Sequence, residues 1–334
     1  MRVLFVILAV LLIVPGWSGE PRLALLGDRP QMIATRVALD PADPRRTRLG
    51  ALTYLGGVAL RSLDPAFGGY SALSVVGDRF TLLSDGGNVV AFTMAADWRP
   101  RALAFRNLPS GPGIGWDKRD RDTESMVVDS RTGRTWVGYE NYNAIWRYAP
   151  GFAGAERWRT PRAMRDWPVN GGPESLARLP DGRFVTISET GHVPPRRWHG
   201  SRRERLRTRD ALIFAGDPTL GGAPAFFAYE PEGKFDPADA AALPNGDLLV
   251  LERDFRLPYR FHNRLALVPA AAIRPGGIAR GRTLGYLDAP LIHDNFEGVA
   301  ITREGGATIV WIVSDDNQSL LQRTLLLKFR LDAR

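Results

Sequence analysis

Cysteine is missing from this sequence, and histidine is scarce. The absence of cysteine excludes disulfides, thiolate metal sites and a cysteine nucleophile. The four histidines are His192, His199, His262 and His293. No two of them have the spacing that places metal ligands on one face of a helix, which argues against a histidine-rich zinc site. There is also no Gly-x-Ser-x-Gly motif, so a serine-hydrolase mechanism has no support in the sequence.

The remaining composition is that of a folded domain with a basic surface. Hydrophobic residues make up 44% of the 334 positions and charged residues 24%, which is enough to bury a core. The 35 glycines and 25 prolines indicate many turns. The formal net charge of +8 suits an acidic partner, which can be a phosphate ester, a polyanion or an anionic surface. Of these we expect a small anionic ester. No recognised nucleic-acid-binding module is present, and we expect a monomer.

The first eighteen residues have the pattern of a signal peptide. A basic start is followed by the unbroken apolar run Val3 to Val14, and Pro15-Gly16 then ends it. Gly16-Trp17-Ser18 fits a small-x-small cleavage site, so we expect cleavage after Ser18 and a periplasmic or secreted protein. An uncleaved signal anchor is the alternative. No second run of membrane length follows, and residues 19–334 are expected to form one domain without an integral membrane segment.

Short β-rich runs separated by turns dominate the rest of the chain, and they repeat. Five units are visible, with first strands that start near residues 71, 125, 175, 239 and 298. Periods of this length with about four strands each predict an all-β fold, a β-propeller. Two further β-like runs in residues 32–61 would either complete the last blade or belong to a sixth blade. A two-domain β-sandwich is the alternative.

Acidic residues recur at the same two places in the units. Glu124, Glu174 and Glu297 precede first strands, and Asp239 lies one position along in the fourth unit. Second strands end on Asp85, Glu140, Glu189, Glu252 and Asp315, the last followed by Asp316. Neighbouring strands are antiparallel, so both places lie at one mouth of the central channel. Carboxylates crowded in this way require protons, arginine partners or a bridging cation, and their hard oxygens suit Ca²⁺ or Mg²⁺. The predicted metal ligands are Glu124, Glu174, Glu189, Glu252, Glu297, Asp315 and Asp316. The alternative is that these acids only cap strand ends and pair with arginines.

Four stretches resemble the phytase-like propeller family described as having esterase-like activity of phytase. They are Gly172 to Gly182 (GPESLARLPDG), Leu248 to Arg253 (LLVLER), Asn295 to Ala300 (NFEGVA), and Ser314 to Asn317 (SDDN) with Gln322 to Leu326. The resemblance covers roughly residues 56–331. It implies an exported β-propeller hydrolase, similar to phytases that use Ca²⁺ to hold phosphate. The first unit carries Tyr70 and the fourth Ala238 where the others carry Glu, which leaves fewer acids than a fully acidic calcium ring has.

Two classes of function follow from these residues. The first is a hydrolase of phosphate or carboxylic esters, in which a bound cation polarises the ester, Glu174 or Glu297 acts as general base, and Arg253 holds the anionic group. The second is a non-catalytic envelope or binding propeller whose recurring acids are structural. The arginine-rich stretch Pro194 to Arg209, between two strands of one unit, is expected to be a solvated loop or an anion-binding lid.

Overall fold

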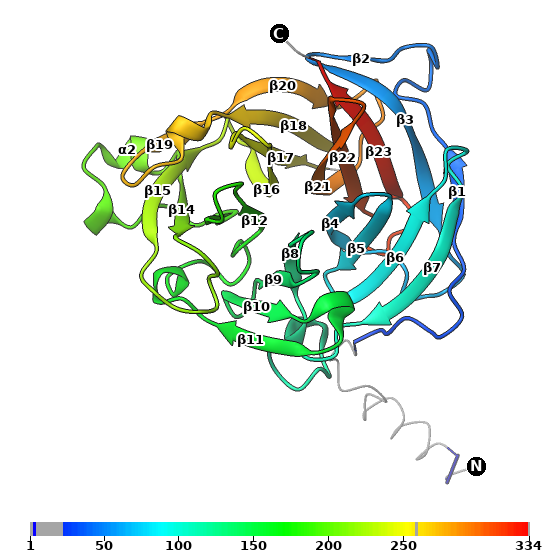
Figure 1. Ribbon diagram of the computed structural model, residues 1–334, viewed down its shortest axis with the longest axis horizontal. Helices are drawn as coiled ribbons and strands as arrows, with labels where there is room; N and C mark the ends of the chain where they lie inside the picture. Colours follow the sequence, from blue (N-terminus) through cyan, green and yellow to red (C-terminus); the bar gives the residue numbers. More distant parts are fainter. Residues whose placement is uncertain (1–2, 5–22, 258–259, 333–334) are drawn as a thin grey trace.

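The computed structural model describes residues 3–4, 23–257 and 260–332. Its strands form five sheets arranged in a ring around a central channel, as Figure 1 shows in the view along that channel. The chain is therefore a five-bladed β-propeller, which confirms the fold class predicted from the repeats. The expected signal peptide and its cleavage site fall largely outside the described residues.

Each blade is an antiparallel sheet whose first strand lines the channel. The strands of the first two blades are β4 (Tyr70–Val76), β5 (Arg79–Ser84), β6 (Asn88–Met94) and β7 (Pro100–Asn107), then β8 (Thr123–Val128), β9 (Thr135–Tyr139), β10 (Ala144–Tyr148) and β11 (Ala155–Arg159). Those of the third and fourth are β12 (Ser175–Arg178), β13 (Phe184–Ile187), β14 (Arg209–Phe214) and β15 (Ala225–Glu230), then β16 (Asp236–Ala242), β17 (Leu248–Arg256), β18 (Arg260–Val268) and β20 (Arg282–Leu287). An extra strand, β19 (Ile278–Arg280), pairs in parallel with β15.

The fifth blade joins the two ends of the chain. It consists of β21 (Asn295–Glu304), β22 (Ala307–Asp315) and β23 (Thr324–Leu331), with β3 (Leu52–Arg61), β1 (Ile33–Arg36) and β2 (Arg48–Leu49) from the N-terminal part. β3 pairs antiparallel with β23 along its length, from Leu331↔Leu52 to Thr324↔Leu60. The β-like runs of residues 32–61 therefore complete the last blade, and the described residues contain no sixth blade. Closure of this kind joins the two ends of the chain in one sheet and leaves only the outer strand of each blade as an edge.

The turns between first and second strands follow from their sequences. In the third and fourth blades they read Leu-Pro-Asp-Gly and Leu-Pro-Asn-Gly. Gly182 and Gly246 have φ values of +90° and +89°, a conformation that glycine adopts without the clash a Cβ would cause. In both turns, the leucine amide donates to the carbonyl of the residue that follows the glycine. The matching geometry confirms that the two segments are copies of one structural unit.

The hydrophobic core is divided among the contacts between adjacent blades. Five clusters of buried side chains are present, one between each pair of neighbours; for example, Val137 of the second blade packs with Leu83 of the first. Each blade buries both faces of its sheet against its neighbours, which is why its strands read as near-continuous apolar runs. The channel-lining strands are thereby held in a fixed ring.

Helices are short and lie in connections. They are η1 (Lys118–Asp120), η2 (Pro150–Phe152), η3 (Arg162–Met164), η4 (Pro195–Arg197), α2 (Arg202–Arg205) and η5 (Ala270–Ala272). No helix among the described residues is long and apolar enough to cross a membrane. The arginine-rich stretch connects β13 to β14, as expected, and contains η4 and α2. It is also anchored, because Arg197 pairs with the buried Asp210 at 2.5 Å and lies over the ring of Phe226.

Candidate functional site at the channel mouth

The position at which acids recur near the start of the first strands is a β-bulge in four of the five blades. In four blades, one residue of the first strand has no partner on the second strand, and these residues are Ser71, Glu124, Ala238 and Glu297. Glu174 holds the same position directly before β12. A bulge turns the extra side chain away from the regular alternation of the strand. Here it directs the carboxylates toward the channel mouth.

The register also corrects one position of the repeat. Tyr70 pairs with Ser84 just as Thr123 pairs with Tyr139, so Ser71, and not Tyr70, is the counterpart of Glu124. The ring of Tyr70 is fully buried in the core cluster between the fifth and first blades. The sequence comparison was shifted by one residue because a bulge adds a position that an alignment by eye does not reveal.

A second ring of charged residues lies at the ends of the second strands. Asp85, Glu140, Glu189, Arg253 and Asp315 hold equivalent positions in the five blades. Together with Glu124, Glu174 and Glu297 they line a cavity of about 490 Å³. The structure thus brings together five of the seven predicted metal ligands, both predicted catalytic residues and the predicted substrate-binding arginine.

Glu252 and Asp316 lie outside this cavity, contrary to expectation. The Glu252 carboxylate has no exposed surface, since it accepts hydrogen bonds from Arg264 Nη1 at 2.6 Å and from the Tyr229 hydroxyl. Its neighbour Arg253 reaches the mouth because successive side chains of a strand point to opposite faces. Asp316 instead accepts from the Gly69 amide at 2.9 Å and from Thr324 Oγ1 at 2.8 Å. The contacts of these two residues match the alternative in which the recurring acids are structural and are not metal ligands.

Asp239 also lies outside the cavity and forms its hydrogen bonds with protein groups. Its carboxylate is buried and accepts from the amides of Val299 at 2.8 Å and Ala240 at 2.7 Å. The first of these bonds ties the fourth blade to the fifth. Recurring acids in this propeller therefore have two roles: some hold blades together, and the rest line the mouth.

Arg253 is the central cation of the cavity. It forms ion pairs with Glu297 and with Glu189, the latter at 2.8 Å, and donates to Asn295 Oδ1 at 2.7 Å. Burial alone would lower the pKa of Arg253, but the charges of Glu297, Glu189 and Glu174 outweigh this effect. The pKa is therefore raised above its usual value, and the guanidinium stays charged. One arginine thereby neutralises acids from the third and fifth blades.

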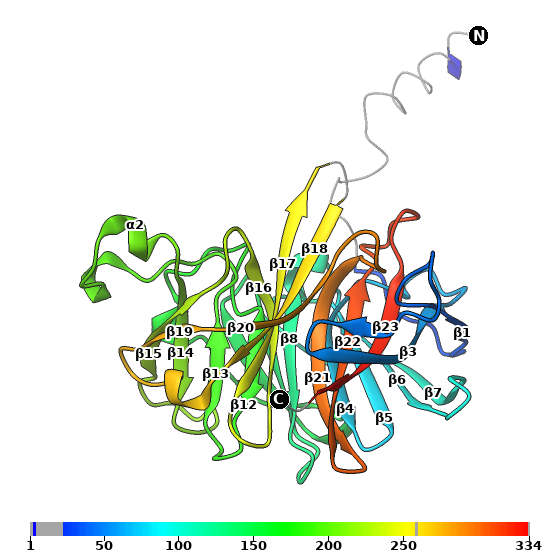
Figure 2. The same ribbon diagram turned by 90° about the horizontal axis from the view of Figure 1, so that it is seen from above.

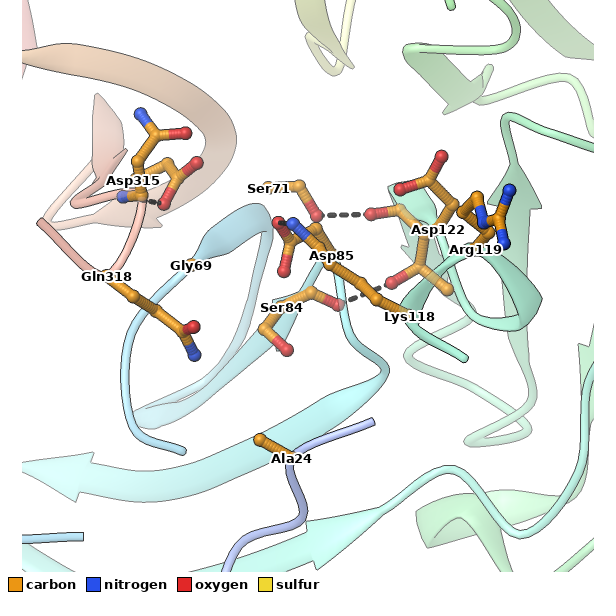
Figure 3. A network of polar contacts seen from close by, with 12 residues as sticks. Ala24, Gly69, Ser71, Ser84, Asp85, Lys118, Arg119, Asp122, Asp315 and Gln318 are labelled. Carbon is orange, nitrogen blue, oxygen red and sulfur yellow. Dashed lines mark hydrogen bonds and ion pairs between the residues drawn. The ribbon is translucent and has the colours of Figure 1, made fainter. Parts of the chain in front are cut away.

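Lys118 and Asp122, which the repeat did not reveal, complete the mouth. Both come from the connection between β7 and β8. Figure 3 shows Lys118 extending to Asp85, with which it forms an ion pair, and Asp122 beside them. Asn141 Nδ2 donates to Asp122 at 2.6 Å. Asp236 also lines the cavity and pairs with Arg209. The first two residues lie in a connection without a counterpart in the other units, so the repeat carries no signal for them.

Several acids of the cavity form no ion pair with a described residue. The ion pairs use Asp85, Glu189, Asp236 and Glu297. The acids without one are Asp122, Glu124, Glu140 and Glu174 around the second and third blades, and Asp315 of the fifth blade. Burial, followed by the neighbouring carboxylates, raises the pKa of Glu124 and of Glu174 well above the usual range. Burial and Glu140 raise the pKa of Asp122 to about 7. These groups are ionised together only if something compensates their charge.

The unpaired acids have the chemistry of a divalent-cation site. Asp122, Glu124 and Glu140 can each offer an oxygen within 4.8 Å of the others, and so can Glu140, Glu174 and Glu189. Oxygens that share a Ca²⁺ ion at 2.3–2.6 Å lie at such mutual distances. The two groups share Glu140, whose side chain also accepts from the Gly171 amide. The residues present therefore fit a hard cation at the boundary of the second and third blades.

An aromatic pair stands at the edge of the cavity. Phe255 and Phe261 face each other across the β17–β18 hairpin with ring centroids 4.9 Å apart, and both line the cavity. Figure 2 shows this hairpin projecting beyond the other loops. The cavity is therefore lined mainly by charged side chains, with two aromatic side chains at one edge.

Comparison with known families agrees with this geometry. The family model for the phytase-like domain, described as esterase-like activity of phytase, matches residues 65–318. The chain belongs to this phytase-like family. The match contains every residue of the two rings at the mouth. No curated protein matches the sequence.

Solved structures resemble the chain only at low similarity. The allergen Mala s 1 of Malassezia sympodialis is 14% identical, with a TM-score of 0.42 over 90% of this chain and 96% of its own. Hydrazine synthase of Kuenenia stuttgartiensis is also 14% identical, with a TM-score of 0.42 over 74% of this chain and 77% of its own. At this similarity neither protein bears on the chemistry of the phytase-like chain.

Proposed function

We propose that this phytase-like propeller hydrolyses phosphate or carboxylic esters with the help of a divalent cation, Ca²⁺ in the first instance. The observation that carries the proposal is the division of the cavity. Lys118 and Arg253 form ion pairs with three acids on one side of the cavity. On the other side, Asp122, Glu124, Glu140 and Glu174 form no ion pair with a described residue, and oxygens of this group lie close enough together to share a cation. A compensating cation would bind there, at Asp122, Glu124, Glu140, Glu174 and Glu189. When bound, such an ion polarises an ester and acidifies a water molecule.

The residues opposite the cation site would bind and orient the substrate. Arg253 is held in place by Glu189, Glu297 and Asn295, and a guanidinium has five N–H donors, more than these three acceptors require. Its remaining donors would hold the anionic group of the ester. The Phe255 ring would exclude water on one side of the substrate. This arrangement favours a small ester with a single charged group over a polyanion, since the cavity holds more acids than bases.

Two carboxylates are candidates for the general base. Glu297 accepts from both Arg253 and Asn295 Nδ2, the latter at 2.7 Å, so its position is fixed beside the anion-binding group. Glu174 lies among the unpaired acids with a raised pKa, and a cation there would turn it into a ligand. We therefore assign the base to Glu297 and a ligand role to Glu174.

The test is turnover by the purified protein. Generic phosphate and acyl esters are supplied with added Ca²⁺ or with chelator, to the wild type and to Glu297→Gln. We expect turnover that needs the cation and falls by at least about a hundredfold in the variant, as for loss of a general base. Glu304→Gln is the matched control, because this exposed acid pairs with Lys328 away from the cavity. Absence of turnover under all conditions would support a non-catalytic binding propeller instead.

We further propose that residues 1–18 direct export. The motive is the apolar run followed by the small-x-small site. Fractionation of cells that express the full chain should recover a product shortened by eighteen residues outside the cytoplasm. Export of a chain that begins at Gly19 to the same extent would contradict this proposal.

A further inference from the structure

Exposed apolar side chains gather on the loops that surround the channel mouth. First strands start at the mouth and second strands end there, so loops before first strands and loops between second and third strands share this side. These loops carry Leu63, Trp116, Leu206, Leu257, Leu320 and Leu321, with exposed fractions from 38% to 104%. They come from loops within three of the five blades and from two connections between blades.

The opposite side of the ring has almost none. Among the described loops on that side, between first and second or third and fourth strands, the exposed large apolar residue is Leu220. Isolated apolar residues are normal on any surface. The two sides of the ring have similar numbers of loops, yet the exposed apolar side chains lie on one of them. Folding does not explain this distribution, because these side chains bury little of their own surface. It indicates a surface that meets an apolar phase.

Arginines accompany the apolar loops on the same side. The connection between β13 and β14 carries exposed arginines at 202, 203 and 207. Arg202 and Arg203 form no ion pair with a described residue, and the nearby Glu204 is used in the capping box with Ser201. Figure 2 shows α2 on the side toward which the β17–β18 hairpin projects. Leucine and tryptophan tips beside unpaired arginines match the chemistry of a bilayer surface with anionic headgroups.

The N-terminal part of the chain joins the propeller on this side as well. The Leu23 amide donates to the carbonyl of Trp116 at 2.9 Å, in the loop before β8. The eight residues 15–22 separate this point from the apolar run Val3 to Val14, and eight residues span at most about 28 Å. In a chain that keeps the run, a membrane that holds the run would lie near the mouth.

We propose that the mouth side of the propeller is a docking surface for an anionic lipid bilayer. The leucine and tryptophan tips enter the headgroup boundary, and the α2 arginines contact lipid phosphates. The channel mouth then opens toward the membrane. This surface does not depend on the proposed hydrolase, because binding to a bilayer requires no turnover.

The test is sedimentation with vesicles. Removal of residues 1–18 leaves every strand of the ring, from Ile33 to Leu331, so the chain that begins at Gly19 avoids direct insertion of the apolar run. We expect this chain to sediment with vesicles of phosphatidylglycerol and phosphatidylcholine, and much less with phosphatidylcholine alone. Leu321→Glu should weaken the binding by roughly tenfold. Arg202→Gln with Arg203→Gln should weaken it by roughly thirtyfold at low salt.

Leu220→Glu is the matched control, since Leu220 is 63% exposed and Leu321 is 74% exposed, on opposite sides. It should bind vesicles as the wild type does, and all variants should keep the wild-type melting temperature. The proposal is overturned if the unsubstituted chain that begins at Gly19 does not sediment with anionic vesicles. It is also overturned if the Leu321→Glu and Leu220→Glu variants of this chain bind the vesicles equally. A dimer in solution that Leu321→Glu dissociates would assign the surface to a second copy and would also overturn it.

Discussion

Glu140→Gln should raise the stability of the cation-free protein and abolish its stabilisation by Ca²⁺. Glu140 belongs to both groups of oxygens that can share a cation. It also contributes to the raised pKa of Asp122, Glu124 and Glu174, so its charge opposes theirs when no cation is bound. The glutamine keeps an oxygen that can accept from the Gly171 amide, and the substitution therefore removes charge with little change of shape.

The size of the effect follows from mass action. A ligand at a hundred times its dissociation constant stabilises the folded state by about 2.7 kcal/mol. An unfolding entropy of about 2.1 cal/mol/K per residue gives roughly 0.7 kcal/mol/K for a chain of this length. Ca²⁺ should therefore raise the melting temperature of the wild type by about 4 °C. The variant should show less than about 1 °C of this rise.

The assay is thermal unfolding of both proteins with Ca²⁺ and with chelator. Glu252→Gln is the control, because this buried acid pairs with Arg264 outside the cavity. It should lower the melting temperature equally in both conditions and leave the calcium effect intact. The reasoning is refuted if Glu140→Gln keeps the full calcium effect, or if it lowers the stability of the cation-free protein.

Three further results are expected. With chelator, the melting temperature should be highest near pH 4 and fall as the pH rises through 7. The reason is that carboxyls with raised pKa, including Asp122 at about 7, hold protons in the folded state that the unfolded chain releases. The free energy of unfolding should fall by about 1.4 kcal/mol per pH unit for each such proton, Ca²⁺ should flatten this pH dependence, and a flat profile with chelator would contradict the prediction. Arg253→Met should cost about 3 kcal/mol in a denaturant titration, since two acids lose their partner, whereas Arg99→Met at the exposed pair with Asp97 should cost less than about 1 kcal/mol. Deletion of residues 23–61 should abolish cooperative unfolding, because β23 then lacks its partner β3; retention of the wild-type transition would show that four complete blades suffice.

The ring of blades could be predicted from the sequence because it repeats. Each unit has the same alternation of short apolar runs and turns, so errors in one copy are corrected by the others. The first strands expected to start near residues 71 and 298 are found at Tyr70–Val76 and Asn295–Glu304. The convergence of the acids followed from antiparallel pairing alone. The number of blades did not, because the pairing of β3 with β23 joins residues more than 260 positions apart.

The individual roles of the acids required the three-dimensional structure. Glu252 and Arg253 are adjacent in the sequence but point to opposite faces of β17, and the sequence does not tell which one reaches the mouth. The bulge that makes Ser71, and not Tyr70, the counterpart of Glu124 is likewise a feature of register. Lys118 and Asp122 come from a connection outside the repeat. Periodicity therefore locates the site, whereas side-chain direction decides its members.

Calcium titration by calorimetry, combined with ester turnover on the same samples, tests the central claim most directly. The claim is that acids of the second and third blades hold a divalent cation that the reaction needs. The wild type should bind Ca²⁺ and hydrolyse a generic phosphate or acyl ester in proportion to the bound ion, and Glu140→Gln should lose both properties together. Calcium-independent turnover by the wild type, or no calcium binding at all, would contradict the claim.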